Sequence, residues 1–300
     1  GLDVVRYPGS ATIEGGLDRF KVGAATLPTR LAGTTSRFIT AVAALGRGAY
    51  TIDGLPPLRR RPMSDLHQAL RDMGASVAAL AVEGHLPVRV QGPLAASDDT
   101  IEVTLRGDVS SQFLSGLLMA APLAQGPLTI ACRDLVSRPY IDLTIAVMAA
   151  FGRTVERDGY DAFTVADLGR YHRDAPYAVE ADASTASYFF ALAAATGSRL
   201  TVTNLRRSSL QGDVAFLDAL EAMGATVTDD DAGIAVQRIN LADPMSWALP
   251  HKVEEQLIAI KERWPGITDF NLHLHNGRGL ALASVCAALR VLGSEDTLRL

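Results

Sequence analysis

A junction that recurs three times is the sequence feature that most limits the folds open to this chain. At Gly74, Gly152 and Gly224, an apolar segment with helical spacing ends and leads within three residues into a Val that follows Ser or Thr. Glycine ends helices readily because it adopts the left-handed backbone conformation that the residue after a helix often needs. The three glycines lie roughly 75 residues apart, which predicts an internal repeat of strands and helices.

The segments around these junctions predict the elements of the repeat. We expect helices at 34–45, 63–74, 144–151 and 214–223, strands at 4–7, 19–22 and 50–53, and a strand after each glycine. Such interleaving is typical of an α/β protein whose units each pack helices on a small mixed sheet, with three or six units in the assembly. An ordinary series of αβ connections without a true repeat remains the alternative.

The last third of the chain has a simpler pattern. Residues 236–300 predict a strand at 236–241, a helix at 251–263, a strand at 270–275, a helix at 280–292 and a strand at 297–300. Plain alternation of this kind predicts a parallel sheet or part of a β/α barrel.

Composition limits the class of protein. Three hundred residues with 48% hydrophobic content favour two domains over one. The longest apolar runs, 114–124 and 188–195, are shorter than the roughly 20 residues of a membrane span. Two cysteines and no signal-peptide pattern favour the cytoplasm, and a net charge of −5 with 6% aromatic residues disfavours nucleic acid as a partner.

The stretch 105–119 predicts an anion-binding site. A Gly-Asp turn is followed by Ser110, Ser111 and Gln112 and then by an apolar helical run. Hydroxyl groups and free backbone N–H groups at a helix start together form a cradle for phosphate or carboxylate. A simple N-cap at Asp108 or Ser110 is the alternative, but a cap does not require the Gln112 amide.

Three other segments offer groups for the same kind of ligand. Gly33 with two threonines precedes the helix at 34–45, where the threonines could also be plain caps. Arg61 ends a run of three arginines on a loop, which could equally be a solvated surface. Ser137 and Tyr140 lie on a loop before the helix at 144–151, from which they could reach a cleft.

Six motifs together resemble the EPSP synthase family, the 3-phosphoshikimate 1-carboxyvinyltransferases, in that family's order over about residues 5–237. They are Gly33–Arg37, Arg60–Met63, Asp108–Phe113, Ser137–Asp142, Glu180–Tyr188 and Leu210–Asp213.

The resemblance implies two domains of repeated βαβαββ units, with the substrates bound between the domains. Residues 1–176 would form one domain, incomplete at its N-terminal side, and 177–237 the first unit of an incomplete second domain. The reaction implied is transfer of the enolpyruvyl group of phosphoenolpyruvate to the 5-hydroxyl of shikimate 3-phosphate, a step of aromatic amino acid biosynthesis that needs no cofactor.

The resemblance also implies roles for residues. Ser110, Ser111, Ser137 and Tyr140 would hold shikimate 3-phosphate, with Gln112 between the two substrates. Gly33 and Arg61 would bind phosphoenolpyruvate.

Parts of the family pattern are missing. Nothing before Gly33 matches the family's N-terminal Lys-Ser motif, and nothing after about residue 237 matches the acidic, Arg and Lys groups of its second domain. The catalytic acid and base therefore remain unassigned, and a site without them would bind anions but turn over poorly.

The C-terminal segment 238–300 resembles part of the barrel of the 3-hydroxy-3-methylglutaryl-CoA lyase family, through residues 239–245, Pro250 and 272–279. His273 and His275 stand two apart on a predicted strand, so they face one side and could share a divalent metal. The early Asp ligand, the later Asn and the Cys-bearing loop of that family are missing.

Three functions therefore remain open: an enolpyruvyl transferase, a fusion with a metal-dependent hydroxyacyl-CoA lyase or aldolase, and a non-catalytic anion-binding protein. Half a barrel leaves apolar faces and sheet edges without partners, so we also expect association with a chain that completes the fold.

Overall fold

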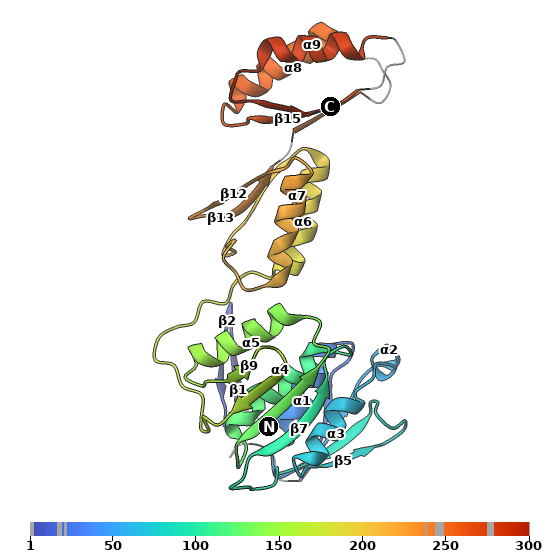
Figure 1. Cartoon of the computed structure of the whole chain (residues 1–300), viewed down its shortest axis with the longest axis vertical. Helices are drawn as coiled ribbons and strands as arrows, with labels where there is room; N and C mark the ends of the chain where they lie inside the picture. The colour runs from blue at the N-terminus through green and yellow to red at the C-terminus, as the bar shows by residue number, and fades with distance from the viewer. Residues whose placement is uncertain are drawn as a thin grey trace. The chain divides into compact units, whose positions relative to one another are not determined.

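The computed structural model describes residues 3–16, 20, 23–237, 239–243, 249–274 and 279–299. The chain divides into two compact units, Gly1–Pro176 (unit 1) and Tyr177–Leu300 (unit 2). Both combine helices with small sheets, so the predicted α/β class is confirmed (Figure 1).

The first repeat of unit 1 is built on a four-stranded sheet with the order β3-β4-β6-β5. β3 and β4 pair in parallel, and β6 pairs antiparallel with both β4 and β5. Along the chain the elements are β3 (Ala24–Pro28), α1 (Gly33–Ala43), β4 (Ala49–Asp53), α2 (Pro56–Arg59), α3 (Ser64–Asp72), β5 (Ser76–Ala79) and β6 (Val88–Gln91).

The second repeat has the same plan. Its sheet has the order β7-β8-β10-β9, with β7 and β8 parallel and the other pairs antiparallel. The elements are β7 (Ile101–Arg106), α4 (Ser111–Ala120), η2 (Ala121–Leu123), β8 (Leu128–Arg133), α5 (Arg138–Ala150), β9 (Glu156–Asp158) and β10 (Ala162–Val165). The shared βαβαββ order and pairing confirm the internal repeat.

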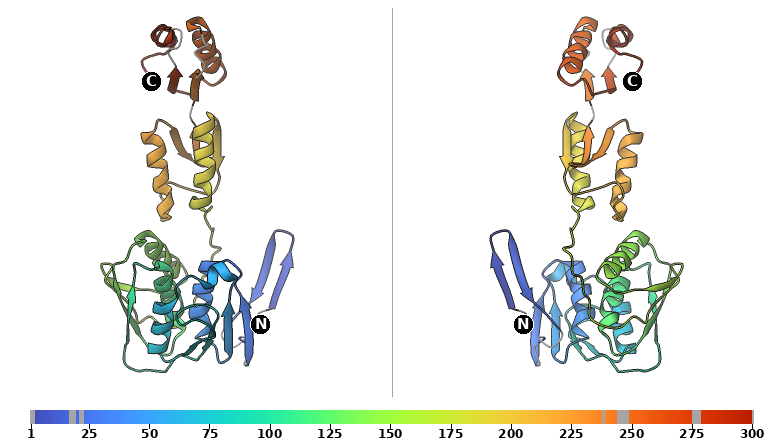
Figure 2. Two further views of the ribbon diagram at one scale, coloured as in Figure 1. Left: turned by 90° about the vertical axis from the view of Figure 1, so that its right-hand side faces the viewer. Right: turned by 90° about the vertical axis from the view of Figure 1, so that its left-hand side faces the viewer.

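One hydrophobic core joins the two repeats of unit 1. It contains fully buried side chains from both sheets and from the helices between them, among them Ile52, Leu66, Phe113 and Phe163. The hairpin of β1 (Asp3–Tyr7) and β2 (Ser10–Glu14) pairs only with itself and stands apart from the two larger sheets (Figure 2).

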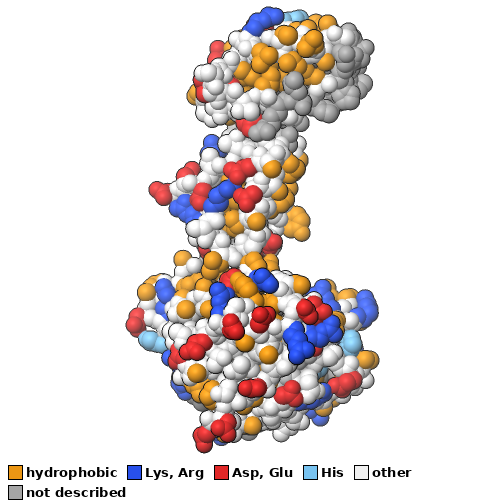
Figure 3. All heavy atoms as spheres, in the orientation of Figure 1, with side chains coloured by type: hydrophobic (Ala, Val, Ile, Leu, Met, Phe, Trp, Pro, Cys, Tyr) orange, Lys and Arg blue, Asp and Glu red, His pale blue; other side chains and the backbone are white. Residues whose placement is uncertain are grey.

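Unit 2 begins with one further set of elements. α6 (Ala183–Thr196), β11 (Arg199–Val202), η3 (Gly212–Ala215), α7 (Phe216–Ala222), β12 (Thr226–Asp230) and β13 (Gly233–Gln237) form an antiparallel sheet of order β11-β13-β12 with two helices. Hydrophobic side chains gather along the flank that α6 and α7 form (Figure 3).

The rest of unit 2 is an open parallel sheet. β14 (Ile239–Asp243), β15 (Asp269–Leu274) and β16 (Thr297–Arg299) pair in parallel, and α8 (Pro250–Arg263) packs against α9 (Ala281–Val291). Its hydrophobic cluster contains Phe270 and Leu272 and is separate from that of the preceding repeat. The alternation predicted for this segment is confirmed, while the domain boundary at 238 stays a prediction.

The predicted junction glycines are confirmed. Gly74, Gly152 and Gly224 have φ angles of +91°, +78° and +89°, which only glycine adopts without strain. Each lies two residues beyond the end of its helix.

Some predicted boundaries were wrong. α5 begins at Arg138, because Pro139 favours the first helical turn, so the expected loop before 144 is helical. The single strand expected at 236–241 is two strands, one ending at Gln237 and one starting at Ile239. The strand expected at 19–22 lies mostly outside the described residues, and among those described no helix is long and apolar enough to span a membrane.

Candidate functional site

A cavity of about 580 Å³ in unit 1 lies against α1, α4 and α5. It contains five of the seven residues predicted to bind substrate: Ser110, Ser111, Gln112, Ser137 and Tyr140. The other lining residues are Thr34, Phe38, Val109, Ser115, Met119, Val136, Leu143, Thr144 and Val147.

The start of α4 supplies the first group of polar atoms. Ser110 is the N-cap, and its Oγ accepts a hydrogen bond from the Gln112 backbone N–H at 3.2 Å. Ser111 is buried, and both serines line the cavity. Capping and lining the cavity therefore coexist at Ser110, and the positive end of the dipole of a ten-residue helix lies at this position.

The Gln112 side chain links this helix start to α1. Its Oε1 accepts a hydrogen bond from Arg37 Nη1 at 2.7 Å, and its Nε2 donates to Thr34 Oγ1 at 2.9 Å. Its amide therefore spans two repeats at the edge of the cavity, which no N-cap would require.

Arg37 is a site residue that the sequence analysis did not single out. Its Nη1 also donates to Ser110 Oγ at 3.0 Å, and its guanidinium lies 5.1 Å from the ring centre of Phe113. Partial burial lowers the pKa of Arg37, and the positive charge of Arg61 lowers it further. The only signal in the sequence was its place in the motif Gly33–Arg37, within the first two turns of the helix.

The start of α5 supplies the second group. Ser137 is the residue before the helix, and Tyr140 lies in the first turn. Ser115 on α4 and Thr144 on α5 share a hydrogen bond of 2.8 Å that holds the two helices together beside the cavity. Two helix N-termini, each with a serine, thus face one cavity, an arrangement that favours an anion.

Gly33 and Arg61 lie next to each other. A Cβ atom at position 33 would stand 2.7 Å from Arg61 Nη1, so the glycine leaves room for the guanidinium. Arg59, in contrast, is bound to Asp53 by a two-point ion pair. Arg61, two residues beyond Arg59, is close to Gly33 at the start of α1, and its charge acts on Arg37.

The threonines expected to cap α1 do not do so. The N-cap of α1 is Ala32, without a side-chain hydrogen bond, and Thr34 instead accepts from Gln112. Thr34, which the local sequence marks as a possible cap, therefore lines the cavity and bonds Gln112 instead.

The side chains of the two histidines predicted to bind a metal lie outside the residues that the structure describes. His273 belongs to β15, but its side chain and the whole of His275 lie outside the described residues. Among the residues that are described, no group of three His, Cys, Asp or Glu side chains could hold a metal ion.

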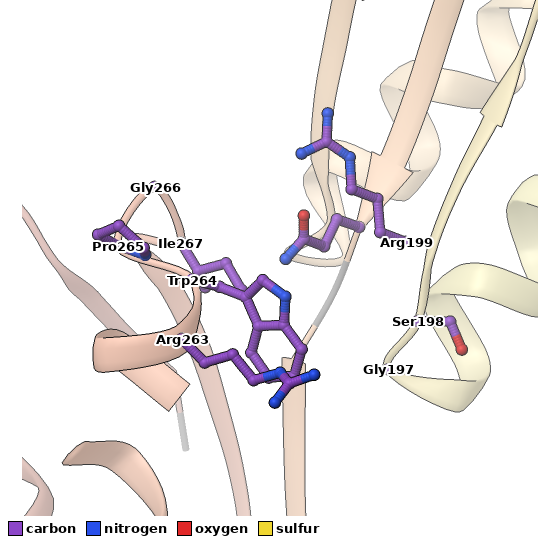
Figure 4. Close-up of a pocket in the computed structure, with 9 residues that line it drawn as sticks. Gly197, Ser198, Arg199, Arg263, Trp264, Pro265, Gly266 and Ile267 are labelled. Atoms are coloured by element: carbon purple, nitrogen blue, oxygen red, sulfur yellow. The ribbon is translucent and has the colours of Figure 1, made fainter. Parts of the chain in front are cut away.

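A second cavity, of about 420 Å³, lies in unit 2 and holds none of the predicted site residues. Arg199, Gln237, Arg263 and Trp264 are among the residues that line it (Figure 4). The Arg263 guanidinium lies over the Trp264 ring, 5.3 Å from its centre.

The polar groups that line the cavity in unit 1 are of the kind that bind anions. Its lining offers hydroxyl, phenol and amide groups and contains no carboxylate, while Arg37 reaches it through Ser110 and Gln112. A negative ligand would find donors and positive charge there without a competing acid.

A family model described as EPSP synthase (3-phosphoshikimate 1-carboxyvinyltransferase) matches residues 3–260. The chain belongs to the EPSP synthase family. The matched residues extend past residue 238, into the C-terminal segment whose sequence pattern predicted a likeness to the 3-hydroxy-3-methylglutaryl-CoA lyase family.

Two 3-phosphoshikimate 1-carboxyvinyltransferases illustrate the relationship. The protein from Methanosphaerula palustris is 43% identical over 242 residues, which are 79% of this chain and 56% of the relative. The one from Erwinia tasmaniensis is 46% identical over 211 residues, which are 70% of this chain and 48% of the relative. The chain thus spans about half the length of the curated relatives it matches.

Solved EPSP synthase structures share the fold. A structure from Acinetobacter baumannii matches with a TM-score of 0.61 at 23% identity, covering 88% of this chain and 59% of the other. A second structure from that organism gives a TM-score of 0.59 and covers 79% of this chain.

Proposed function

We propose that the cavity of unit 1 binds shikimate 3-phosphate and phosphoenolpyruvate and serves the enolpyruvyl transfer that the EPSP synthase family catalyses. The observation that carries the proposal is the convergence of Ser110, Ser111, Gln112, Ser137 and Tyr140 on one cavity beside Arg37. Both substrates are anions, and the two helix N-termini there suit anionic groups.

The roles that we propose for these groups are those that the resemblance to the EPSP synthase family implies. The serines at the starts of α4 and α5, with Tyr140, hold shikimate 3-phosphate. Gln112 lies between the substrates, and Gly33 with Arg61 receives phosphoenolpyruvate. We add Arg37 to this set, because it bonds both Ser110 and Gln112 and lies near Arg61.

The transfer joins the enolpyruvyl group to the 5-hydroxyl and releases inorganic phosphate. It needs a proton removed from the hydroxyl and one delivered to the methylene carbon, and the methyl group so formed must lose a proton again as phosphate leaves. The lining of the cavity contains no carboxylate, lysine or histidine that could do either. We therefore expect the 300-residue chain to bind both anions and to release phosphate slowly without the groups that the rest of its relatives' length supplies.

Titration calorimetry with shikimate 3-phosphate and a phosphate-release assay test this. Loss of one hydrogen bond to a charged ligand costs about 1.5–3 kcal/mol, so Ser137→Ala should weaken shikimate 3-phosphate binding roughly tenfold or more. Ser76→Ala, on β5 and outside the cavity lining, is the matched control and should bind as the parent does. Absence of binding by the parent chain would refute the assignment, and binding without any phosphate release would favour a non-catalytic anion-binding protein.

The C-terminal segment carries the second candidate, a metal-dependent hydroxyacyl-CoA lyase or aldolase activity. Its support is the parallel order β14-β15-β16, which is the local arrangement of a β/α barrel. Calorimetry with Mn²⁺ on the parent chain and on His273→Ala tests it, and equal heats from both would exclude the metal pair. The transferase assignment needs no cofactor, and we place the protein in the cytoplasm.

A further inference from the structure

Ser137 stands at the start of α5 without the hydrogen bond that a serine in this position usually makes. It is the N-cap of the helix, yet its side chain accepts no hydrogen bond from the first turn. Ser110, the N-cap of α4, does accept one from a backbone N–H. Within the described residues the Ser137 hydroxyl makes no other hydrogen bond either. The hydroxyl is therefore free for a ligand, but the helix start lacks the contact that usually fixes it.

Side chains of the β9–β10 hairpin hold this helix start instead. Tyr160, in the turn between the two strands, donates a hydrogen bond of 2.7 Å from its Oη to the carboxylate of Asp142 on α5. Arg157 of β9 forms an ion pair with the same carboxylate. Arg138, the first residue of α5, places its guanidinium 4.7 Å from the centre of the Tyr160 ring. Tyr160 thus contacts both ends of the first turn, because residues 138 and 142 lie four apart on one face of the helix.

The turn that carries Tyr160 is itself firmly held. The backbone C=O of the next residue, Asp161, accepts a hydrogen bond of 2.7 Å from the N–H of Cys132. Cys132 is buried on β8, an inner strand of the sheet β7-β8-β10-β9. Tyr160 is half-buried and packs against the core of unit 1, and the Arg157 guanidinium lies 5.1 Å from its ring centre. A side chain fixed in this way can orient the residues that it contacts.

We propose that Tyr160 is a positioning residue of the cavity in unit 1, which fixes the first turn of α5 so that Ser137 and Tyr140 are oriented to hold shikimate 3-phosphate. Ser137 precedes this turn and Tyr140 lies within it, so both move with it. Tyr160 does not line the cavity and therefore acts through them. A cap bond would occupy the Ser137 hydroxyl, whereas the contacts of Tyr160 steady the helix start and leave that hydroxyl for the ligand. The inference rests on the proposed function and assigns it a further residue.

Titration calorimetry of the full chain with shikimate 3-phosphate tests this role. Tyr160→Leu removes the hydroxyl and the aromatic ring together, and it should weaken binding roughly tenfold. Tyr160→Phe keeps the ring beside the guanidinium groups, so it should restore binding to within about threefold of the parent. Circular dichroism checks that both variants are folded.

Two ion pairs near opposite ends of α5 provide a matched comparison. Asp142→Asn removes the charge that pairs with Arg157 at the start of the helix, and it should weaken binding roughly threefold. Asp167→Asn removes the charge that pairs with Arg153, just beyond the other end of the helix, and should bind as the parent does. The thirteen residues of α5 separate the two ends by about 20 Å. Equal losses from the two variants would contradict the inference.

A double variant separates positioning from a general loss of structure. Tyr160→Leu and Ser137→Ala should each cost roughly tenfold, so independent effects would multiply to about a hundredfold. If Tyr160 acts through the Ser137 hydroxyl, the double variant should lose less than about thirtyfold. Losses that multiply in full, or a Tyr160→Leu variant that binds like the parent, would overturn this inference and leave the proposed function in place. A parent chain that does not bind shikimate 3-phosphate would overturn both.

Discussion

His67 should make unit 1 lose stability as the pH falls below neutrality. The side chain lies on α3 and is fully buried, and neither ring nitrogen has a hydrogen-bond partner among the described residues. Burial lowers the pKa of His67 to about 4, with a further contribution from the charge of Arg71 and an opposing one from Glu83. The folded state therefore keeps this imidazole neutral.

The sign and the size of the effect follow from linkage. In the unfolded chain the imidazole has a pKa of about 6.5, so below that pH the unfolded state binds a proton that the folded state does not. This imidazole therefore does not lower the free energy of unfolding above about pH 6.5, and it lowers that free energy increasingly as the pH falls toward 4. The loss from this group is about 2 kcal/mol at pH 5 and approaches about 3 kcal/mol below pH 4, because each unit of pKa difference corresponds to about 1.4 kcal/mol.

The assay compares urea unfolding of the parent chain and of His67→Leu at pH 7 and pH 5. Both tryptophans, Trp247 and Trp264, belong to unit 2, so their fluorescence does not report on His67. Hydrogen exchange measured by mass spectrometry on peptides from α3 and β7 follows unit 1 directly. The variant should lose about 2 kcal/mol less than the parent between the two pH values.

His172→Leu serves as the control, because the His172 side chain is 76% exposed and changes its surroundings little on unfolding. It should show the pH dependence of the parent. If His67→Leu and the parent lose equal stability between pH 7 and pH 5, the burial argument for His67 is wrong.

Three further substitutions test the packing and the site. Gly33→Ala places a methyl group 2.7 Å from Arg61 Nη1, so it should weaken phosphoenolpyruvate binding roughly tenfold in calorimetry while changing the unfolding free energy by less than about 0.5 kcal/mol. Gly92→Ala should cost about 3 kcal/mol or more in urea unfolding, because its Cβ would lie 2.0 Å from a backbone carbonyl oxygen at the end of α1, whereas Gly15→Ala, with open space around it, should cost much less. Asp182→Ala removes the side chain that accepts from a first-turn amide of α6 and should cost about 1 kcal/mol of stability, measured by hydrogen exchange on peptides from α6.

Local patterns located most of the candidate site but not its connections. Ser110 and Ser111 were found because hydroxyl groups at a helix start are a recognisable pattern, whereas Ser137 was expected on a loop and was found through the motif that resembles the family. Arg37 was missed, since its role depends on bonds to Ser110 and Gln112, which lie more than seventy residues away. Nothing in the local sequence around an arginine in a helix says which distant groups will meet it.

The sequence by itself determined the units of this protein: glycines with a positive φ follow the ends of α3, α5 and α7, and the periodicity of the apolar residues assigns most segments to a helix or a strand. Those are short-range effects of backbone sterics and side-chain spacing. The tertiary structure alone decided that Thr34 accepts from Gln112 instead of capping α1, and that α1 packs against α4 while Tyr188 and Leu192 of α6 stay exposed. These outcomes depend on which surfaces are available to pack against each other.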